Sequence, residues 1–176
     1  FQKIDLHQEI TKDRVQAMCE QLVQDNLLSQ EVAAQINLEG IVNFYQTPVG
    51  QLVLAHPDQV FREVPFSLVI QPEKLFAITA TASKPILVHG IIDGYVDTGD
   101  EVVIFDYKTN HPFGHMAATR RAGAVAGEDA QAFSERMKRE YRGQLNLYQL
   151  ALQQMVATPV THKYLYLTQT GETVEV

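Results

Sequence analysis

The sequence predicts an α/β domain that begins with a helical part and continues into β-strands accompanied by one long helix. The chain has 176 residues, of which 45% are hydrophobic and 20% are charged, as expected for one globular domain. Apolar residues recur at helical spacing in the first third and then alternate with period two in the centre. A further helical pattern and a further strand pattern follow.

The first third is expected to be helical. Thr11 or Asp13 can cap a helix that runs to about residue 26, and a second apolar stripe predicts another helix over residues 29–44. Gly40 is expected to interrupt that second helix. A break follows at residues 47–50, after which a short helix can extend to His56.

The centre is expected to form three strands, over residues 60–70, 86–96 and 101–108. Pro65 indicates an edge or bulge position for the first strand. The turn residues 97–100 predict that the second and third strands form a hairpin.

The remaining third combines a loop, a helix and a strand. Residues 110–127 have no clear period, which predicts a long functional loop or a mobile segment. A long helix is expected from about 129 to 157, and a last strand over 162–168.

Charge and cysteine content narrow the class of protein. A net charge of −7 disfavours nucleic-acid binding, unless bound divalent metal ions cancel acidic ligands. Cys19 is alone, which excludes an internal disulfide framework, a four-cysteine zinc site and an iron–sulfur cluster, and suits a reducing, cytoplasmic setting. No apolar run reaches about 18 residues, so we expect no transmembrane helix. Because the chain begins at Phe1 without an initiator Met, we expect an excised piece of a longer protein.

Three charged side chains are predicted to converge on the hairpin. If the turn over residues 97–100 closes the hairpin, Asp93 faces Ile104. Asp93 and Asp106 then share one face at diagonal positions on neighbouring strands, with about 7–8 Å between their backbones. Lys108, two residues beyond Asp106, lies on the same face.

Two carboxylates and an ammonium suit metal-assisted phosphodiester hydrolysis. Carboxylate oxygens are ligands for Mg²⁺, and Lys108 can position a water or offset developing charge. The alternative is a solvated strand face, but the neighbouring residues are strongly apolar, and buried charges need compensation. A three-residue turn would instead shift the pairing by one residue, so that Asp93 no longer shares a face with Asp106 and Lys108.

Further polar side chains are candidates for the same site. Glu63 can be a neighbouring metal ligand, with an edge-strand charge as the equal alternative. Gln144 and Tyr148 share one face of the long helix with Tyr141; we expect a polar role for the glutamine and core packing for both tyrosines.

Basic and histidine side chains surround these candidates. Seven Lys or Arg stand against four Asp or Glu between residues 108 and 142. Arg136, Arg139 and Arg142 can contact DNA phosphates or form a solvated helix face. His111 and His115 can contact phosphate or be exposed loop residues, and we favour the exposed positions.

Four short motifs in order resemble the RecB-type nucleases of the PD-(D/E)xK superfamily. The resemblance covers nearly the whole chain and is greatest to the C-terminal nuclease domains of AddA-like (RexA-like) helicase–nuclease subunits. The motifs are Arg62-Glu63-x-Pro65-Phe66, Gly90-x-x-Asp93, Asp106-Tyr107-Lys108-Thr109 and Gln144-Leu145-x-x-Tyr148.

The resemblance implies a restriction-endonuclease-like core, in which a mixed sheet is flanked by helices. It implies cleavage of single DNA strands with Mg²⁺, for which Mn²⁺ can substitute, during resection of double-strand breaks in the bacterial cytoplasm. Asp93 and Asp106 would bind metal, and Lys108, Gln144 and Tyr148 would complete the catalytic set. The partners would be DNA, the rest of an AddA-like chain and an AddB-like protein. ATP would be used only by the helicase part, because this chain has no phosphate-binding loop for it.

One family feature is missing from the sequence. Such nucleases usually carry a metal-binding histidine in a helix upstream of the region where this chain begins, and His7 is no obvious substitute. We therefore expect residues 1–176 to be a single nuclease domain that lacks this helix and binds metal weakly by itself. Two alternatives remain: a non-catalytic module for docking or guiding DNA, and a stand-alone restriction-type endonuclease.

Overall fold

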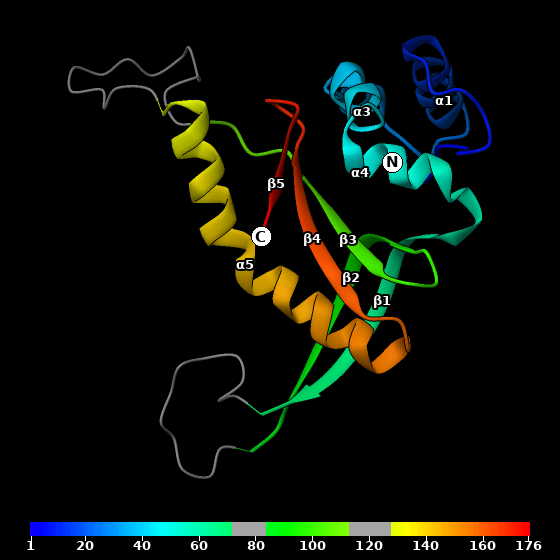
Figure 1. Ribbon diagram of the computed structural model, residues 1–176. Helices are drawn as coiled ribbons and strands as arrows, with labels where there is room; N and C mark the ends of the chain where they lie inside the picture. Colours follow the sequence, from blue (N-terminus) through cyan, green and yellow to red (C-terminus); the bar gives the residue numbers. More distant parts are fainter. Residues whose placement is uncertain (72–83, 113–127) are drawn as a thin grey trace.

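A five-stranded mixed sheet forms the centre of the molecule (Figure 1). The computed structural model describes residues 1–71, 84–112 and 128–176. The strand order is β1-β2-β3-β4-β5, and only the β3–β4 pair is parallel. The strands are β1 (Val60–Ile70), β2 (Ile86–Asp97), β3 (Val102–Lys108), β4 (Val160–Leu167) and β5 (Glu172–Glu175). The expected α/β class with a mixed sheet is confirmed.

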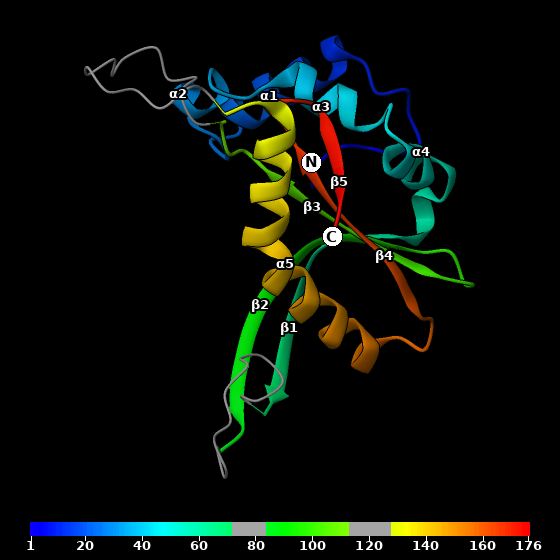
Figure 2. The ribbon, with the colours of Figure 1, turned by 60° about the vertical axis from the view of Figure 1, so that its left-hand side comes forward.

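Helices cover both faces of this sheet (Figures 1 and 2). The N-terminal helices pack on one face around Phe44, Phe105 and Tyr166, and α5 packs on the other face around Phe133 and Leu145. The N-terminal group comprises α1 (Lys12–Gln24), α2 (Gln30–Ala33), α3 (Leu38–Phe44), α4 (Pro48–Ala55) and the 3₁₀ turn η1 (Pro57–Gln59), and α5 spans Ala130–Met155. No helix in the described ranges is long and apolar enough to cross a membrane.

The helix over residues 29–44 was predicted as one element but is two. The break falls between α2 and α3, because the Asn37 side chain accepts from Gly40 N and donates to Thr168 O. Gly40 lies inside α3, where a Cβ would come within 2.7 Å of Thr168 O. Its lack of a side chain lets α3 approach β4, where the Tyr166 hydroxyl donates to Gly40 O.

Other predicted boundaries agree with the structure within a few residues. Thr11 and Asp129 cap α1 and α5, and Pro48 begins α4 behind the cap Thr47. Pro65 lies in the edge strand β1, as expected. The strand expected last is followed by β5, so the prediction of four strands was wrong. The predicted loop 110–127 falls mostly outside the described residues.

The sheet forks where the candidate charges lie. Pairing of β2 with β3 ends at Gly94 and Phe105, after which β2 continues with β1 as a two-stranded arm and β3 continues with β4. Figure 2 shows this arm descending away from β3 and β4, with α5 lying across the fork. The fork therefore leaves one edge of β2 open beside α5.

The predicted hairpin register was wrong by two residues. Ile104 pairs with Tyr95 rather than with Asp93, because the hairpin closes at Asp97 and Val102. A shift of two preserves the face of every side chain. The pairing ends at Gly94 and Phe105, so Asp93 and Asp106 are the first residues beyond the paired part of the two strands.

Candidate active site

Asp106 is a fully buried carboxylate on the α5 side of β3. Its side chain has 0% exposure, and Lys108 Nζ lies 2.5 Å from its Oδ2. Neither carboxylate oxygen accepts a well-directed hydrogen bond from the residues that the structure describes. Burial, reinforced by the negative charge of Asp93, raises the pKa of Asp106 to about 6, although Lys108 and Tyr148 beside it counteract part of the rise.

Asp93 lies at the branch point of the fork. Its Oδ2 accepts a hydrogen bond of 3.1 Å from Tyr107 N, so the carboxylate spans the opening between β2 and β3. Both Ile92 and Tyr95 contact the core under α5, although strict alternation would place them on opposite faces. The reversal around Asp93 therefore coincides with the fork.

The backbone of β1 is strained at the same level. Glu63 has φ 53°, a left-handed conformation that costs a non-glycine residue about 1–2 kcal/mol. Arg62 on one side of it donates to Phe1 O and Ile4 O, whereas Val64 on the other side packs toward α5. The left-handed residue reverses the faces of β1 where β2 reverses its own.

A chain of polar contacts joins β3 to α5. Lys108 Nζ donates to Gln144 Oε1 at 2.9 Å, and Gln144 Nε2 donates to the Tyr148 hydroxyl at 2.8 Å. The four-residue spacing places Gln144 and Tyr148 on one face of α5. This face lies over Asp106 and Lys108, so the structure brings together Asp106, Lys108, Gln144 and Tyr148, with Asp93 adjoining.

Tyr141 is a member of this constellation that the sequence analysis assigned to packing. Lys108 Nζ lies 4.2 Å from the centroid of its ring, and its hydroxyl donates to Asn110 Oδ1 at 3.1 Å. The signal was its spacing of three residues from Gln144, which places both on the same face. The packing expectation is correct in part, because the Tyr141 ring also contacts the core under α5.

An open groove of about 790 Å³ runs from this constellation along the arm. Gly90 lines it, and a Cβ there would come within 2.5 Å of the Phe66 ring. That ring packs edge-on against Tyr148, with centroids 5.9 Å apart. The motif that contains Phe66 thus packs against Tyr148, the last residue of the helix motif, and the motif that contains Gly90 leaves room for the Phe66 ring. The lining is Phe66, Val88, His89, Gly90, Ile91, Asp93, Tyr141, Gln144, Leu147 and Tyr148.

The donor set fits a magnesium ion. Mg²⁺ is usually held by one or two carboxylates and keeps several waters, and Asp106 offers buried oxygens that lack hydrogen bonds within the described ranges. Within those same ranges no group of three His, Cys, Asp or Glu gathers, which excludes a histidine–cysteine cage there. Asp93 and Asp106 are the side chains that would hold the ion.

Glu63 is not brought together with the two aspartates. Its side chain is exposed on the edge strand β1. In the described part of the chain it forms no three-carboxylate group with Asp93 and Asp106.

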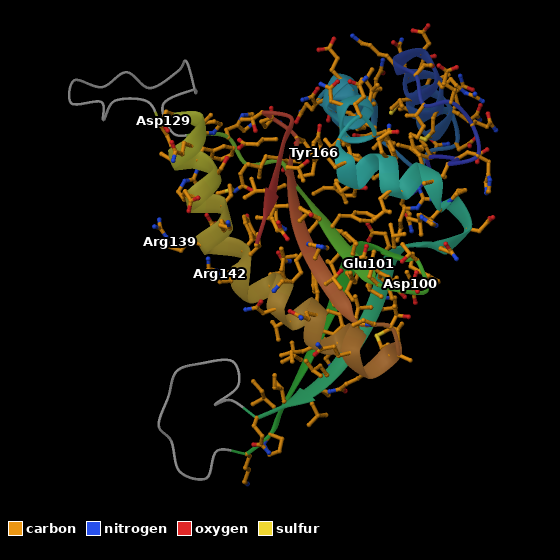
Figure 3. The ribbon with its side chains drawn as sticks, viewed as in Figure 1. Asp100, Glu101, Asp129, Arg139, Arg142 and Tyr166 are labelled. Atoms are coloured by element: carbon orange, nitrogen blue, oxygen red, sulfur yellow. The ribbon has the colours of Figure 1, made fainter. Side chains whose placement is uncertain are left out.

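The three arginines predicted to contact DNA lie in two environments. Arg136 is held by Glu128 through contacts of 2.9 and 3.0 Å, so a DNA contact would have to displace that carboxylate. Arg139 and Arg142 are exposed on the outer side of α5 (Figure 3). At 3.6 residues per turn they lie on the opposite side of the helix from Gln144. His111 is exposed as expected, and His115 lies outside the described residues.

Comparisons with known proteins identify the family of the chain. A model of the PD-(D/E)XK nuclease superfamily matches residues 2–175. The chain belongs to this superfamily. The resemblance inferred from the four motifs is therefore confirmed at the level of the family.

Curated relatives are similar over the whole chain. The A subunit of the ATP-dependent helicase/nuclease of Levilactobacillus brevis is 43% identical over 176 residues, which is 100% of this chain and 13% of that protein. The proteins of the same name from Ligilactobacillus salivarius and Limosilactobacillus fermentum are 38% and 40% identical over 99% and 96% of this chain. The chain spans 12% of the length of each of these two. The similarity to AddA-like proteins is thus confirmed for this portion of them.

Proposed function

We propose that this domain is a metal-dependent nuclease that hydrolyses phosphodiester bonds of single DNA strands. The observation that carries the proposal is the buried Asp106 carboxylate, which meets the charges of Asp93 and Lys108 at the end of a groove. Burial beside Asp93 makes the ionised form of this carboxylate costly and raises its pKa, and the neighbouring Lys108 offsets only part of that cost. A cation bound at this carboxylate offsets that cost.

The carboxylates of Asp93 and Asp106 are proposed to hold Mg²⁺, for which Mn²⁺ can substitute. The bound ion would act as a Lewis acid that lowers the pKa of a water and offsets negative charge on the phosphate. Lys108 would donate from its ammonium to the attacking water or to a phosphate oxygen. Gln144 orients that ammonium through its Oε1, and the Tyr148 hydroxyl in turn fixes the Gln144 amide.

The character of the groove supports a single-stranded substrate. Its lining is mostly apolar and aromatic, and its one charged residue in the described part of the chain is Asp93. Such a surface accommodates unstacked bases, which duplex DNA keeps inside. Arg139 and Arg142 are proposed to contact phosphates outside the groove, because they lie on the outer side of α5.

The names of the relatives support a role in a larger machine. We propose that the domain acts in an AddAB-like helicase–nuclease of the bacterial cytoplasm, in which ATP is used by the helicase part and an AddB-like protein is the partner. The unwound strand would be delivered to the groove, and its cleavage would resect double-strand breaks before recombinational repair. A chain that covers 13% of such a relative would supply only the nuclease step.

The test is Asp106→Asn in the helicase–nuclease complex that carries this domain. We expect DNA-stimulated ATP hydrolysis and unwinding to persist, while cleavage of a labelled strand falls at least 100-fold, because the substitution removes a carboxylate ligand. Unwinding serves as the control for folding and assembly. Cleavage that persists in Asp106→Asn contradicts the proposal and favours a non-catalytic module that docks or guides DNA.

A further inference from the structure

Tyr141 is fixed against the ammonium of Lys108. The 4.2 Å between Lys108 Nζ and the ring centroid is within the range of about 6 Å for a cation–π contact. The Tyr141 hydroxyl donates to Asn110 Oδ1, so the ring is anchored at its far end by the segment that follows β3. The ring and the lysine therefore occupy defined positions relative to each other.

Three neighbours of different character surround the ammonium. Asp106 Oδ2 lies at 2.5 Å, Gln144 Oε1 at 2.9 Å, and the face of the Tyr141 ring lies beside both. The Lys108 side chain is only 12% exposed, so little water can replace a lost neighbour. Asp106 provides the strongest attraction, because it carries the opposite charge.

In the proposed function, on which this inference rests, Asp106 cannot serve Lys108 alone, because its carboxylate also holds a metal ion. A divalent cation at Asp106 would share its carboxylate and weaken the pull on Lys108. An aromatic ring is not a ligand for a hard cation such as Mg²⁺, so the contact with Tyr141 is unaffected by that competition. We infer that Tyr141 is a positioning residue, which with Gln144 keeps the Lys108 ammonium at the reacting phosphate when Asp106 is engaged elsewhere.

Two kinds of substitution distinguish the effect of the Tyr141 ring from that of its hydroxyl bond to Asn110. Tyr141→Phe keeps the ring over Lys108 and loses only the bond to Asn110, whereas Tyr141→Leu and Tyr141→Met remove the ring. In the helicase–nuclease complex with Mg²⁺, we expect the last two to lower kcat for a single-stranded oligonucleotide about tenfold. Tyr141→Phe should stay within about threefold of the wild-type kcat, and KM should change less than about twofold in all three.

A second readout needs neither metal nor activity. Acylation of lysines in the metal-free complex, followed by peptide mass spectrometry, reports how accessible the Lys108 ammonium is. We expect Tyr141→Leu and Tyr141→Met to raise Lys108 labelling several-fold relative to the exposed Lys84, and Tyr141→Phe to leave it unchanged. Leu150→Ala, which removes a half-buried side chain from the same helix away from the site, is the control for general loosening of α5.

The outcomes distinguish the inference from the proposed function. A tenfold loss of kcat and raised labelling, both restored by the phenylalanine variant, support the positioning role. Wild-type kcat and labelling in Tyr141→Leu, or an equal loss of kcat in Leu150→Ala, overturn it. A wild-type complex that unwinds DNA without cutting it refutes the proposed nuclease function instead. In that case the labelling experiment still tests the contact, because unchanged Lys108 labelling in Tyr141→Leu would overturn it.

Discussion

Replacement of Asp106 by asparagine should stabilise the protein at pH 8 by an amount that disappears in acid. The pKa of Asp106 is about 6 in the folded protein, against 3.8 as its ordinary value. Because the folded pKa is the higher one, the unfolded chain releases this proton first as the pH rises from about 4 to 6. The wild-type free energy of unfolding therefore falls through that window, and asparagine abolishes the fall.

The magnitude follows from the size of the pKa difference. Each pKa unit corresponds to roughly 1.4 kcal/mol, so the stability difference between Asp106→Asn and the wild type should grow by about 2.4 kcal/mol from pH 4 to pH 8. The new amide contributes an offset through its own hydrogen bonds, but that offset is the same at both pH values. The change with pH is therefore the quantity to compare.

Urea unfolding of the metal-free chain in EDTA, at pH 4, 6 and 8, measures this difference. Asp100→Asn is the matched control, since it replaces an exposed carboxylate in the turn between β2 and β3 (Figure 3) and should change the stability by less than about 0.5 kcal/mol. A difference that stays constant with pH, or that shrinks as the pH rises, would refute the burial argument for Asp106.

Three further predictions follow from the same geometry. Lys108→Met removes the ammonium beside Asp106, so the pKa of Asp106 should rise further. Strand cleavage, measured on gels, should fall about 100-fold, with little change in DNA affinity as measured by fluorescence anisotropy. A wild-type cleavage rate would contradict the role of the lysine. Gly94→Ala places a Cβ 2.1 Å from the Phe105 ring and should cost about 1–3 kcal/mol in urea unfolding. Gly143→Ala, with open space around it on α5, should instead stabilise by up to about 1 kcal/mol, and equal effects of the two would be inconsistent with the packing at the fork. Arg139→Gln with Arg142→Gln should weaken single-strand binding and reduce its salt slope by roughly 0.7 per lost contact while kcat stays unchanged, whereas an unaltered slope would remove both from the DNA path.

The main elements of the fold were predictable from local sequence signals. Alternation of apolar residues defined β1, β2 and β3, and the caps Thr11 and Asp129 marked where α1 and α5 begin. β5 was missed because Glu172–Glu175 carries a single buried apolar residue, Val174, and depends on β4 for its pairing. A strand of this kind has no pattern of its own to detect.

The hairpin register shows a second limit of local signals. Turn residues at 97–100 predicted closure at Val96 and Glu101, whereas the strands pair as far as Asp97 and Val102. The side chain of Thr98 bonds to the backbone of Glu101 inside that turn. The shift by two residues kept the paired residues of β2 and β3 on their predicted faces. Beyond the last pair, the fork rather than the register sets the position of Asp93, whose Oδ2 accepts from Tyr107 N.

The fork itself was not predictable, because it depends on long-range packing. The left-handed Glu63 and the reversal of faces around Asp93 arise where α5 crosses the sheet. For the same reason the contact of Tyr141 with Lys108 could not be read from spacing alone: the sequence aligned Tyr141 with Gln144, but only the crossing of α5 over β3 brings the ring to the lysine.

The most direct test of the central claim, that Asp93 and Asp106 hold a divalent metal ion, is Mn²⁺ binding by calorimetry. It compares the wild-type helicase–nuclease complex with complexes carrying Asp93→Asn or Asp106→Asn. We expect the wild type to bind at least one ion that both variants lose, because each removes a carboxylate from a site built on two. Equal binding by all three would place the ion elsewhere and contradict the account.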